Sequence, residues 1–187
     1  MESTKTRILK KLLETDGYLS GQELCEQLGV SRTAVWKYMK QLKEEGYEIE
    51  AVQNKGYCLK DVPDVLGESE IKSRLHTRWA GQTLYYYDEI DSTNTQIKRL
   101  AEEDAPHGTL AVADYQSRGK GRRGRAWDSP HGSAIYMSIL FRPEIRPDRA
   151  SMLTLVIGLS VTQAIRSNLG LQAQIKWPNE IGRASCR

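Results

Sequence analysis

Residues 31–59 read SRTAVWKYMKQLKEEGYEIEAVQNKGYCL, and this stretch decides the fold of the N-terminal part of the chain. Apolar residues recur at helical spacing over 32–45, and Ser31 directly before them is a favoured N-cap residue. Two strand-like runs follow, 47–52 and 57–59, and the Asn and Gly between them adopt the positive φ of hairpin turns. The stretch therefore predicts a helix followed by a β-hairpin.

Two shorter helices are predicted upstream of this stretch. The first has an apolar stripe and would end at Asp16-Gly17; the second begins after Ser20 as N-cap and ends at Gly29. The stripe of the first helix consists of Ile8, Leu9, Leu12 and Leu13. Three helices with a tight glycine-containing turn, followed by a hairpin, predict a winged helix-turn-helix over residues 1–62.

The outer face of the third helix and the hairpin tip provide candidate DNA contacts, because a recognition helix reads the major groove from its N-terminal residues. These candidates are Ser31, Arg32, Thr33, Trp36, Lys37 and Lys55. A trihelical protein-interaction module is the alternative, since short helical units also bind proteins. One such DNA-binding module binds weakly by itself, so a homodimer on two half-sites is expected.

Composition places the chain among globular proteins and concentrates its positive charge in one segment. Apolar residues make up 39% and charged residues 27%, and the net charge is +3. Five basic residues against one acid give residues 115–130 a local charge of +4. No run of apolar residues predicts a membrane helix or a signal peptide, so we expect a cytoplasmic protein without a membrane partner. The three scattered cysteines and three histidines predict neither disulfides nor a metal site.

Residues 61–64, Asp-Val-Pro-Asp, are the predicted linker to a second domain over 63–180. The predicted elements are helix 68–75, strand 84–87, a helix opening at 91–94, strands 110–114 and 135–141, helix 151–169 stopped by Gly170, and strand 174–177. Mixed helices and strands in this order predict an α+β domain with a mixed sheet.

Residues 116–125 read QSRGKGRRGR, a pattern suited to holding phosphate. Glycines let the backbone approach an anion, and each guanidinium forms charge-assisted hydrogen bonds of about 1.5–3 kcal/mol. Gly119, Gly121 and Gly124 also fit G-x-G-x-x-G, but Trp-Asp-Ser-Pro at 127–130 forbids the helix that a dinucleotide-binding loop opens, which excludes that fold. An exposed Arg/Gly loop that touches RNA is the alternative.

Three motifs stand in the order and approximate spacing of the biotin-protein ligases: Asp91-Ser92-Thr93-Asn94, GKGRRGRAW at 119–127, and Lys176-Trp177-Pro178-Asn179. Behind a winged helix, they resemble the bifunctional ligases that also act as biotin operon repressors. The resemblance covers about residues 5–179, and the Gly/Arg loop is its specific part. It implies a ligase domain with a mixed sheet like that of class II synthetases.

The resemblance also implies roles for individual residues. The biotin-binding set would be Ser92, Thr93, Asn94, Gln116, Gly119, Lys120, Gly121 and Arg122. The ATP-binding set would be Arg122, Arg125, Trp127, Lys176 and Asn179, with Trp127 stacked on adenine. Arg122, which would restrain the acyl-adenylate, and Lys176 would be the catalytic residues. From the residues alone, Ser92 could equally cap its helix, Trp127 could be a core aromatic and Lys176 could be solvated.

The implied reaction forms biotinyl-5′-AMP from biotin and ATP, then transfers biotin to a lysine of an acceptor carboxylase subunit. Mg²⁺ would be held mainly by the ATP phosphates, and no protein metal ligands are implied. The adenylate-bound homodimer would bind operator DNA and repress biotin biosynthesis genes. A repressor that senses a small ligand without chemistry is the alternative, and a lipoate ligase relative fits the winged helix and the loop poorly.

The C-terminal end departs from the family pattern. Glu180 stands where the family usually has Asp, and residues 181–187, IGRASCR, read like a cloning scar or a break in the reading frame. The family's following strands, which include a lysine that closes over the biotin carboxylate, do not follow in this sequence. We therefore expect residues 63–180 to form an incomplete catalytic domain, and this stretch to have impaired ligase activity or none.

Overall fold

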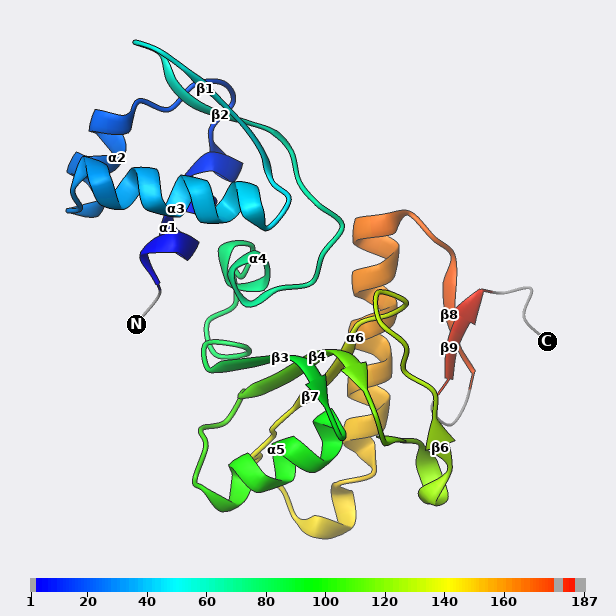
Figure 1. Cartoon of the computed structure of the whole chain (residues 1–187). Helices are drawn as coiled ribbons and strands as arrows, with labels where there is room; N and C mark the ends of the chain where they lie inside the picture. The colour runs from blue at the N-terminus through cyan, green and yellow to red at the C-terminus, as the bar shows by residue number, and fades with distance from the viewer. Residues whose placement is uncertain (1–2, 177–179, 184–187) are drawn as a thin grey trace. The chain divides into compact units, whose positions relative to one another are not determined.

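The computed structural model describes residues 3–176 and 180–183, without the side chains of Arg122 and Arg183 (Figure 1). By its contacts the chain divides into two compact units, residues 1–142 and 143–187, which are described separately. The domain boundary predicted at 62/63, from the linker at residues 61–64, stays a prediction.

Three helices and a hairpin form the N-terminal part, as predicted. They are α1 (Thr4–Glu14), α2 (Gly21–Leu28), α3 (Arg32–Glu44), β1 (Glu48–Val52) and β2 (Gly56–Asp61). Each helix has a serine N-cap, Ser3, Ser20 or Ser31, whose hydroxyl accepts a backbone N–H three residues later. Gly29 ends α2 in the left-handed conformation. Helix α3 stops at Glu44, one residue before the predicted end.

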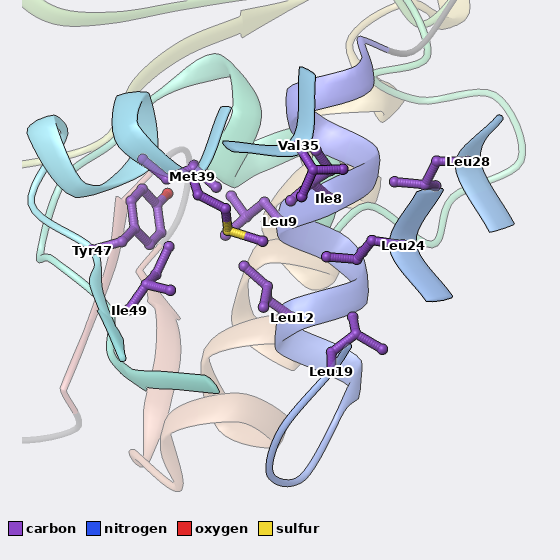
Figure 2. Packing of buried hydrophobic residues seen from close by; sticks show 11 residues of the cluster. Ile8, Leu9, Leu12, Leu19, Leu24, Leu28, Val35, Met39, Tyr47 and Ile49 are labelled. Carbon is purple, nitrogen blue, oxygen red and sulfur yellow. The ribbon is translucent and has the colours of Figure 1, made fainter. Parts of the chain in front are cut away.

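A single apolar cluster holds these elements together. Ile8, Leu9, Leu24 and Leu42 have no exposed surface, and Met39 is almost completely buried. Figure 2 shows Leu9, Leu12 and Met39 converging between the helices. Tyr47 and Ile49 at the start of the hairpin belong to the same cluster, so the wing packs against the helices.

The hairpin turn requires glycine at one position. Asn54 and Gly56 both have positive φ, 65° and 113°. Gly56 also lies against the chain before α2: a Cβ at this position would be 2.2 Å from the carbonyl oxygen of Leu19. Leu19 and Tyr57 exchange two backbone hydrogen bonds there, of 2.8 and 2.9 Å, which tie the wing to the helices.

A three-stranded mixed sheet forms the centre of the predicted ligase domain. Strands β3 (Leu84–Ile90) and β4 (Leu110–Gln116) are parallel, and β7 (Tyr136–Ile139) is antiparallel to β4. The crossover helix α5 (Thr93–Glu102) lies along one face of the sheet (Figure 1). Ile97 and Leu100 of α5 pack with Ala105 and Ala111. The short helix α4 (Glu68–Ser73) precedes the sheet. The predicted α+β class and the mixed sheet are confirmed.

The Gly/Arg loop folds as a small hairpin. Strands β5 (Gly119–Lys120) and β6 (Ala126–Trp127) pair antiparallel around a 3₁₀ turn, η1 (Arg122–Gly124). In the described segment between β6 and β7 the loop leads into extended chain and the strand β7, not into a helix. The hairpin itself was not predicted.

The second unit contains the turn η2 (Pro147–Arg149), helix α6 (Met152–Leu169) and a hairpin of β8 (Ala173–Lys176) and β9 (Glu180–Arg183). Gly170 ends α6 in the left-handed conformation, as predicted. The strand β9 was not predicted, and Trp177 at the predicted end of β8 lies outside the described residues. Among the helices of the described ranges, none combines the length and apolarity needed to cross a bilayer.

A pair of glycine substitutions tests the packing of the wing. Gly56→Ala should destabilise the N-terminal part by more than about 3 kcal/mol, because a Cβ there combines positive φ with a backbone clash. Gly29→Ala is the control: φ is 66° but the Cβ would meet open space, so about 1 kcal/mol is expected. Hydrogen exchange of the α1 amides measures both opening free energies; equal losses would contradict the packing described.

Candidate functional site

The candidate site lies where two parallel strands end side by side. Ile90 at the end of β3 pairs with Gln116 at the end of β4. The pairing continues past the strands, because Ser117 N–H donates to Ile90 O at 2.9 Å and Arg118 N–H donates to Asp91 O at 2.8 Å. The start of α5 and the start of the Gly/Arg loop therefore meet at one edge of the sheet, the edge where α/β proteins commonly bind ligands.

Gln116 joins these two segments through a buried network. Its Oε1 accepts from the backbone N–H of Thr93 at 2.8 Å and from the Thr93 hydroxyl at 3.1 Å. Its Nε2 donates to Ser129 Oγ at 2.9 Å. Thr93 Oγ1 in turn accepts from Ser138 of β7 at 3.0 Å. Gln116 thus takes the place of a helix cap for α5 and fixes the amide orientation on which any ligand contact depends.

Ser92 has a buried hydroxyl without a hydrogen-bond partner among the described residues. The residue is 1% exposed and occupies the N-cap position of α5, yet its side chain makes no capping hydrogen bond. An unpaired buried hydroxyl costs about 1–3 kcal/mol, so this hydroxyl is available to a partner from outside the chain, a ligand or a water. The interpretation of Ser92 as a simple helix cap is therefore wrong.

Charged residues surround this edge. Asp91 forms an ion pair with Arg99 at 2.8 Å and accepts the Ser92 N–H at 2.7 Å. The Arg99 hydrogen bond, aided by the Ser92 N–H, lowers the pKa of Asp91 below its ordinary value. Asp91 thus stabilises the fold above its ordinary pKa, and this contribution is lost as the pH falls through the lowered pKa. Lys120 reaches α5 as well, where its Nζ donates to Thr95 Oγ1 at 3.0 Å.

The loop is built with a tight base and an open tip. Gly119 permits the base, because a Cβ there would be 2.3 Å from Trp127 O and 2.7 Å from Ser129 Oγ. The tip turns through two left-handed residues, Arg123 and Gly124, with φ of 58° and 74°. Gly121 N–H donates to Arg125 O at 2.8 Å across the turn. Basic side chains are thereby exposed around a backbone that can approach an anion closely.

The structure brings most of the predicted biotin-binding residues together and leaves others apart. Thr93 and Gln116 share one hydrogen-bond network, Ser92 directly precedes Thr93, and Gly119 and Lys120 lie beside them. The Arg122 side chain and Asn179 lie outside the described residues. Lys176 belongs to the second unit, where it forms an ion pair with Glu180 at 3.2 Å.

Two features of the site were not predicted from sequence, and a third was left open. Ser129 and Ser138 complete the Gln116 and Thr93 hydrogen bonds, and no pattern in the sequence distinguishes them from other serines. Trp127 is 61% exposed, so the interpretation of this residue as a core aromatic is wrong. An exposed indole next to a basic loop is suited to stacking on a planar ring.

The N-terminal part presents a separate polar face. Arg32, Thr33, Trp36 and Lys37 are exposed along α3, and Trp36 is 59% exposed. The Ser31 hydroxyl is occupied as the cap of α3, where it accepts the Ala34 N–H at 3.2 Å.

A groove of about 580 Å³ separates α3 from the wing. Arg32 and Lys55 line it from opposite sides, together with Gln22 near the start of α2. The N-terminal half of α3 and the wing thus each bring one basic side chain to this groove.

Comparison with known proteins decides the family. A family model described as “Biotin/lipoate A/B protein ligase family” matches residues 86–182, more than half of the chain. The chain belongs to the biotin/lipoate A/B protein ligase family. A second model, described as “HTH domain”, matches residues 4–58. The resemblance inferred from the three motifs and the winged helix is confirmed.

The relatives of this ligase-family chain are longer than it is. The Bifunctional ligase/repressor BirA of Bacillus spizizenii is 46% identical over 183 residues, which cover 97% of this chain and 56% of the relative. The protein of the same name from Escherichia coli is 35% identical over 171 residues, covering 91% of this chain and 51% of the relative. The chain therefore spans about half the length of these relatives.

A solved structure, the biotin protein ligase from Aquifex aeolicus in complex with biotin and ATP, is 37% identical, covers 54% of this chain and 41% of that chain, and has a TM-score of 0.47. The assignment to the ligase family rests on the sequence matches.

Two buried serines of the ligase domain should respond oppositely to removal of the hydroxyl. Ser92→Ala removes an unpaired group and should leave stability unchanged or slightly raised. Ser129→Ala strips Gln116 Nε2 of its partner and should cost about 1–3 kcal/mol. Urea denaturation monitored by far-UV circular dichroism compares the two variants. A loss at Ser92 as large as that at Ser129 would contradict the orphan hydroxyl.

Proposed function

We propose that the protein activates biotin with ATP to biotinyl-5′-AMP and transfers biotin to a lysine of an acceptor carboxylase subunit. The observation that carries this proposal is the buried, unpartnered Ser92 hydroxyl at the edge where β3, α5 and the basic loop meet. The proposal is supported by the family match and by the names of the relatives, which combine a ligase with a repressor.

On the biotin side of the proposed site, polar side chains are held in place by hydrogen bonds to one another. Thr93 and Gln116 use their polar atoms on each other and on neighbouring serines, so in this proposal they shape the pocket. Ser92 Oγ and the N-terminal N–H groups of α5 are then the donors for biotin, with Asn94 exposed beside them. A helix N-terminus favours a carboxylate, which is the group of biotin that reacts.

The phosphate side of the proposed site is the loop. In the first step a biotin carboxylate oxygen attacks the α-phosphorus of MgATP, the bond to the bridging oxygen breaks, and pyrophosphate leaves. Lys120 and Arg125, together with the N–H groups around Gly121, supply positive charge where the phosphoryl group gains negative charge. Arg122 keeps its proposed role on the acyl-adenylate, and Trp127 is proposed to stack on adenine.

In the second step the amine of the acceptor lysine attacks the acyl carbon, AMP leaves, and the amine loses a proton. The described residues contain no group of three or more His, Cys, Asp or Glu that could hold a metal ion. The proposal treats Mg²⁺ as part of the MgATP substrate, carried by the phosphates. Lys176 and Asn179 remain proposed contacts on the nucleotide side.

We propose that the winged helix binds operator DNA. The supporting observations are the exposed face of α3 and the basic groove next to the wing. A homodimer that forms when the adenylate is bound would place two such modules on two half-sites and so couple biotin supply to repression. With ATP and DNA as partners, the proposed location is the cytoplasm.

The ligase proposal is tested by biotin-dependent exchange of labelled pyrophosphate into ATP, using the full gene product. Exchange is expected, and Ser92→Ala should raise the biotin concentration for half-maximal rate about tenfold, since one hydrogen bond is lost. The exposed Ser117→Ala change in the same segment is the control. Biotin binding without any exchange would favour a repressor that senses biotin without chemistry.

DNA binding is tested by the salt dependence of affinity for a non-specific duplex. Lys37→Gln on the proposed contact face should weaken binding and reduce the slope of log K against log salt by about 1, because one phosphate contact is lost. Lys43→Gln makes the same charge change at the other end of α3 and should leave the slope unchanged. Equal slopes for the two variants would contradict the proposed face.

A further inference from the structure

The segment that returns from the Gly/Arg loop, residues 129–133, is fastened to the end of β4 by Asp114. Asp114 Oδ1 accepts the Gly132 N–H at 3.1 Å, and Asp114 Oδ2 lies 2.7 Å from His131 Nδ1. The imidazole of His131 also stacks on the Tyr115 ring, with centroids 4.7 Å apart and an interplanar angle of 16°. One carboxylate and one ring of β4 therefore hold two consecutive residues of the return segment.

The other residues of the return segment are tied as well. Gln116 N–H donates to Ser129 O at 3.2 Å, in addition to its side-chain bond to Ser129 Oγ. Pro130 O accepts from Ser133 Oγ at 2.9 Å and from Tyr136 OH at 3.1 Å. This many hydrogen bonds within five residues restrict the motion of the segment.

The return segment sets the position of the loop through steric contact. Ser129 Oγ would be 2.7 Å from a Cβ on Gly119, and it donates to Trp127 O at 3.2 Å. The two strands of the loop hairpin, which begin and end at Gly119 and Trp127, are thus in contact with Ser129. A shift of residues 129–133 would move both strands.

The loop tip is exposed, in contrast to the buried base at Gly119 and Ser129. Arg123, Gly124 and Arg125 are exposed, and Lys120 Nζ donates to Thr95 in an exposed contact. An exposed tip can adapt to a ligand, provided that its base stays fixed.

We infer that Asp114 and His131 are positioning residues: they hold the base of the loop so that its basic tip closes over the phosphoryl group from a fixed hinge. This inference rests on the proposed function and adds two residues that touch neither substrate in it. Asp114 acts through its two hydrogen bonds, and His131 acts through its stack on Tyr115 and its bond to Asp114.

Limited trypsin digestion of the 187-residue chain tests the hinge without any ligand. Asp114→Ala should speed cleavage after Arg123 and Arg125 about tenfold, because two hydrogen bonds at the base are lost. Asp114→Asn keeps an acceptor for Gly132 and offers a donor to His131 Nδ1, so it should stay within about twofold of the wild type. Asp148→Ala, an exposed aspartate of the second unit, is the matched control.

Cleavage after Arg99 in α5 separates a local from a global effect. If Asp114→Ala speeds cleavage at Arg99 as well as in the loop, the variant His131→Phe tests the hinge instead. This change keeps the stack on Tyr115 and removes only the bond to Asp114. Cleavage in the loop is expected to be about threefold faster than in the wild type. Unchanged loop cleavage in both variants would overturn the inference, and so would equal effects of Asn and Ala at position 114.

The ligand arm uses the full gene product and biotinyl-5′-AMP. Asp114→Ala should speed dissociation of the adenylate about tenfold. Asp114→Asn should dissociate the adenylate at close to the wild-type rate. A wild type that binds no adenylate would defeat the proposed function while the digestion result still decides the hinge. Wild-type retention in Asp114→Ala would overturn the inference alone.

Discussion

The parallel pairing of β3 with β4 is the constraint on which the site depends. It places Ile90 opposite Gln116, so a helix start and a loop start that are far apart in sequence emerge next to each other. Gln116 accepts the first N–H of α5, that of Thr93. The Ser92 hydroxyl makes no capping hydrogen bond to the N–H groups that follow in α5, so a buried polar group at this edge is available to a ligand.

A second constraint is steric. Gly119, Trp127 and Ser129 approach so closely that the base of the loop has essentially one arrangement. The basic tip is not constrained in this way, since the residues around Arg123 and Gly124 are exposed. A rigid base and an adaptable tip suit the proposed role of the loop, in which it admits a nucleotide and then excludes water from an acyl-adenylate.

The parts of the fold that could be predicted are those specified locally. Serine caps, glycine stops and apolar periodicity predicted α2 and α3 to within a residue, and Asn54 with Gly56 identified the wing. Helix α1 ends at Glu14, before the predicted stop at Asp16-Gly17. The hairpin β5–β6 was missed because strands of two residues carry no period that can be recognised. The strand β8 was predicted, but β9 was missed because residues 181–187 were interpreted as a cloning scar or a break in the reading frame. Ser129 and Ser138 were missed because their roles come from tertiary contacts with Gln116 and Thr93.

The candidate site residues were predicted chiefly from the resemblance of three motifs to a known family. The structure adds how two of them are placed: Gln116 bonds the start of α5, and the Ser92 hydroxyl is buried without a partner among the described residues. The central claim is that this edge of the sheet and the Gly/Arg loop bind biotin and the acyl-adenylate biotinyl-5′-AMP. Isothermal titration calorimetry of the full gene product with biotin, and then with biotinyl-5′-AMP, tests it most directly. We predict binding heat for both ligands. Biotinyl-5′-AMP should bind at least about tenfold more tightly than biotin, because only the adenylate contacts the basic loop. Absence of binding heat for both ligands would contradict the account.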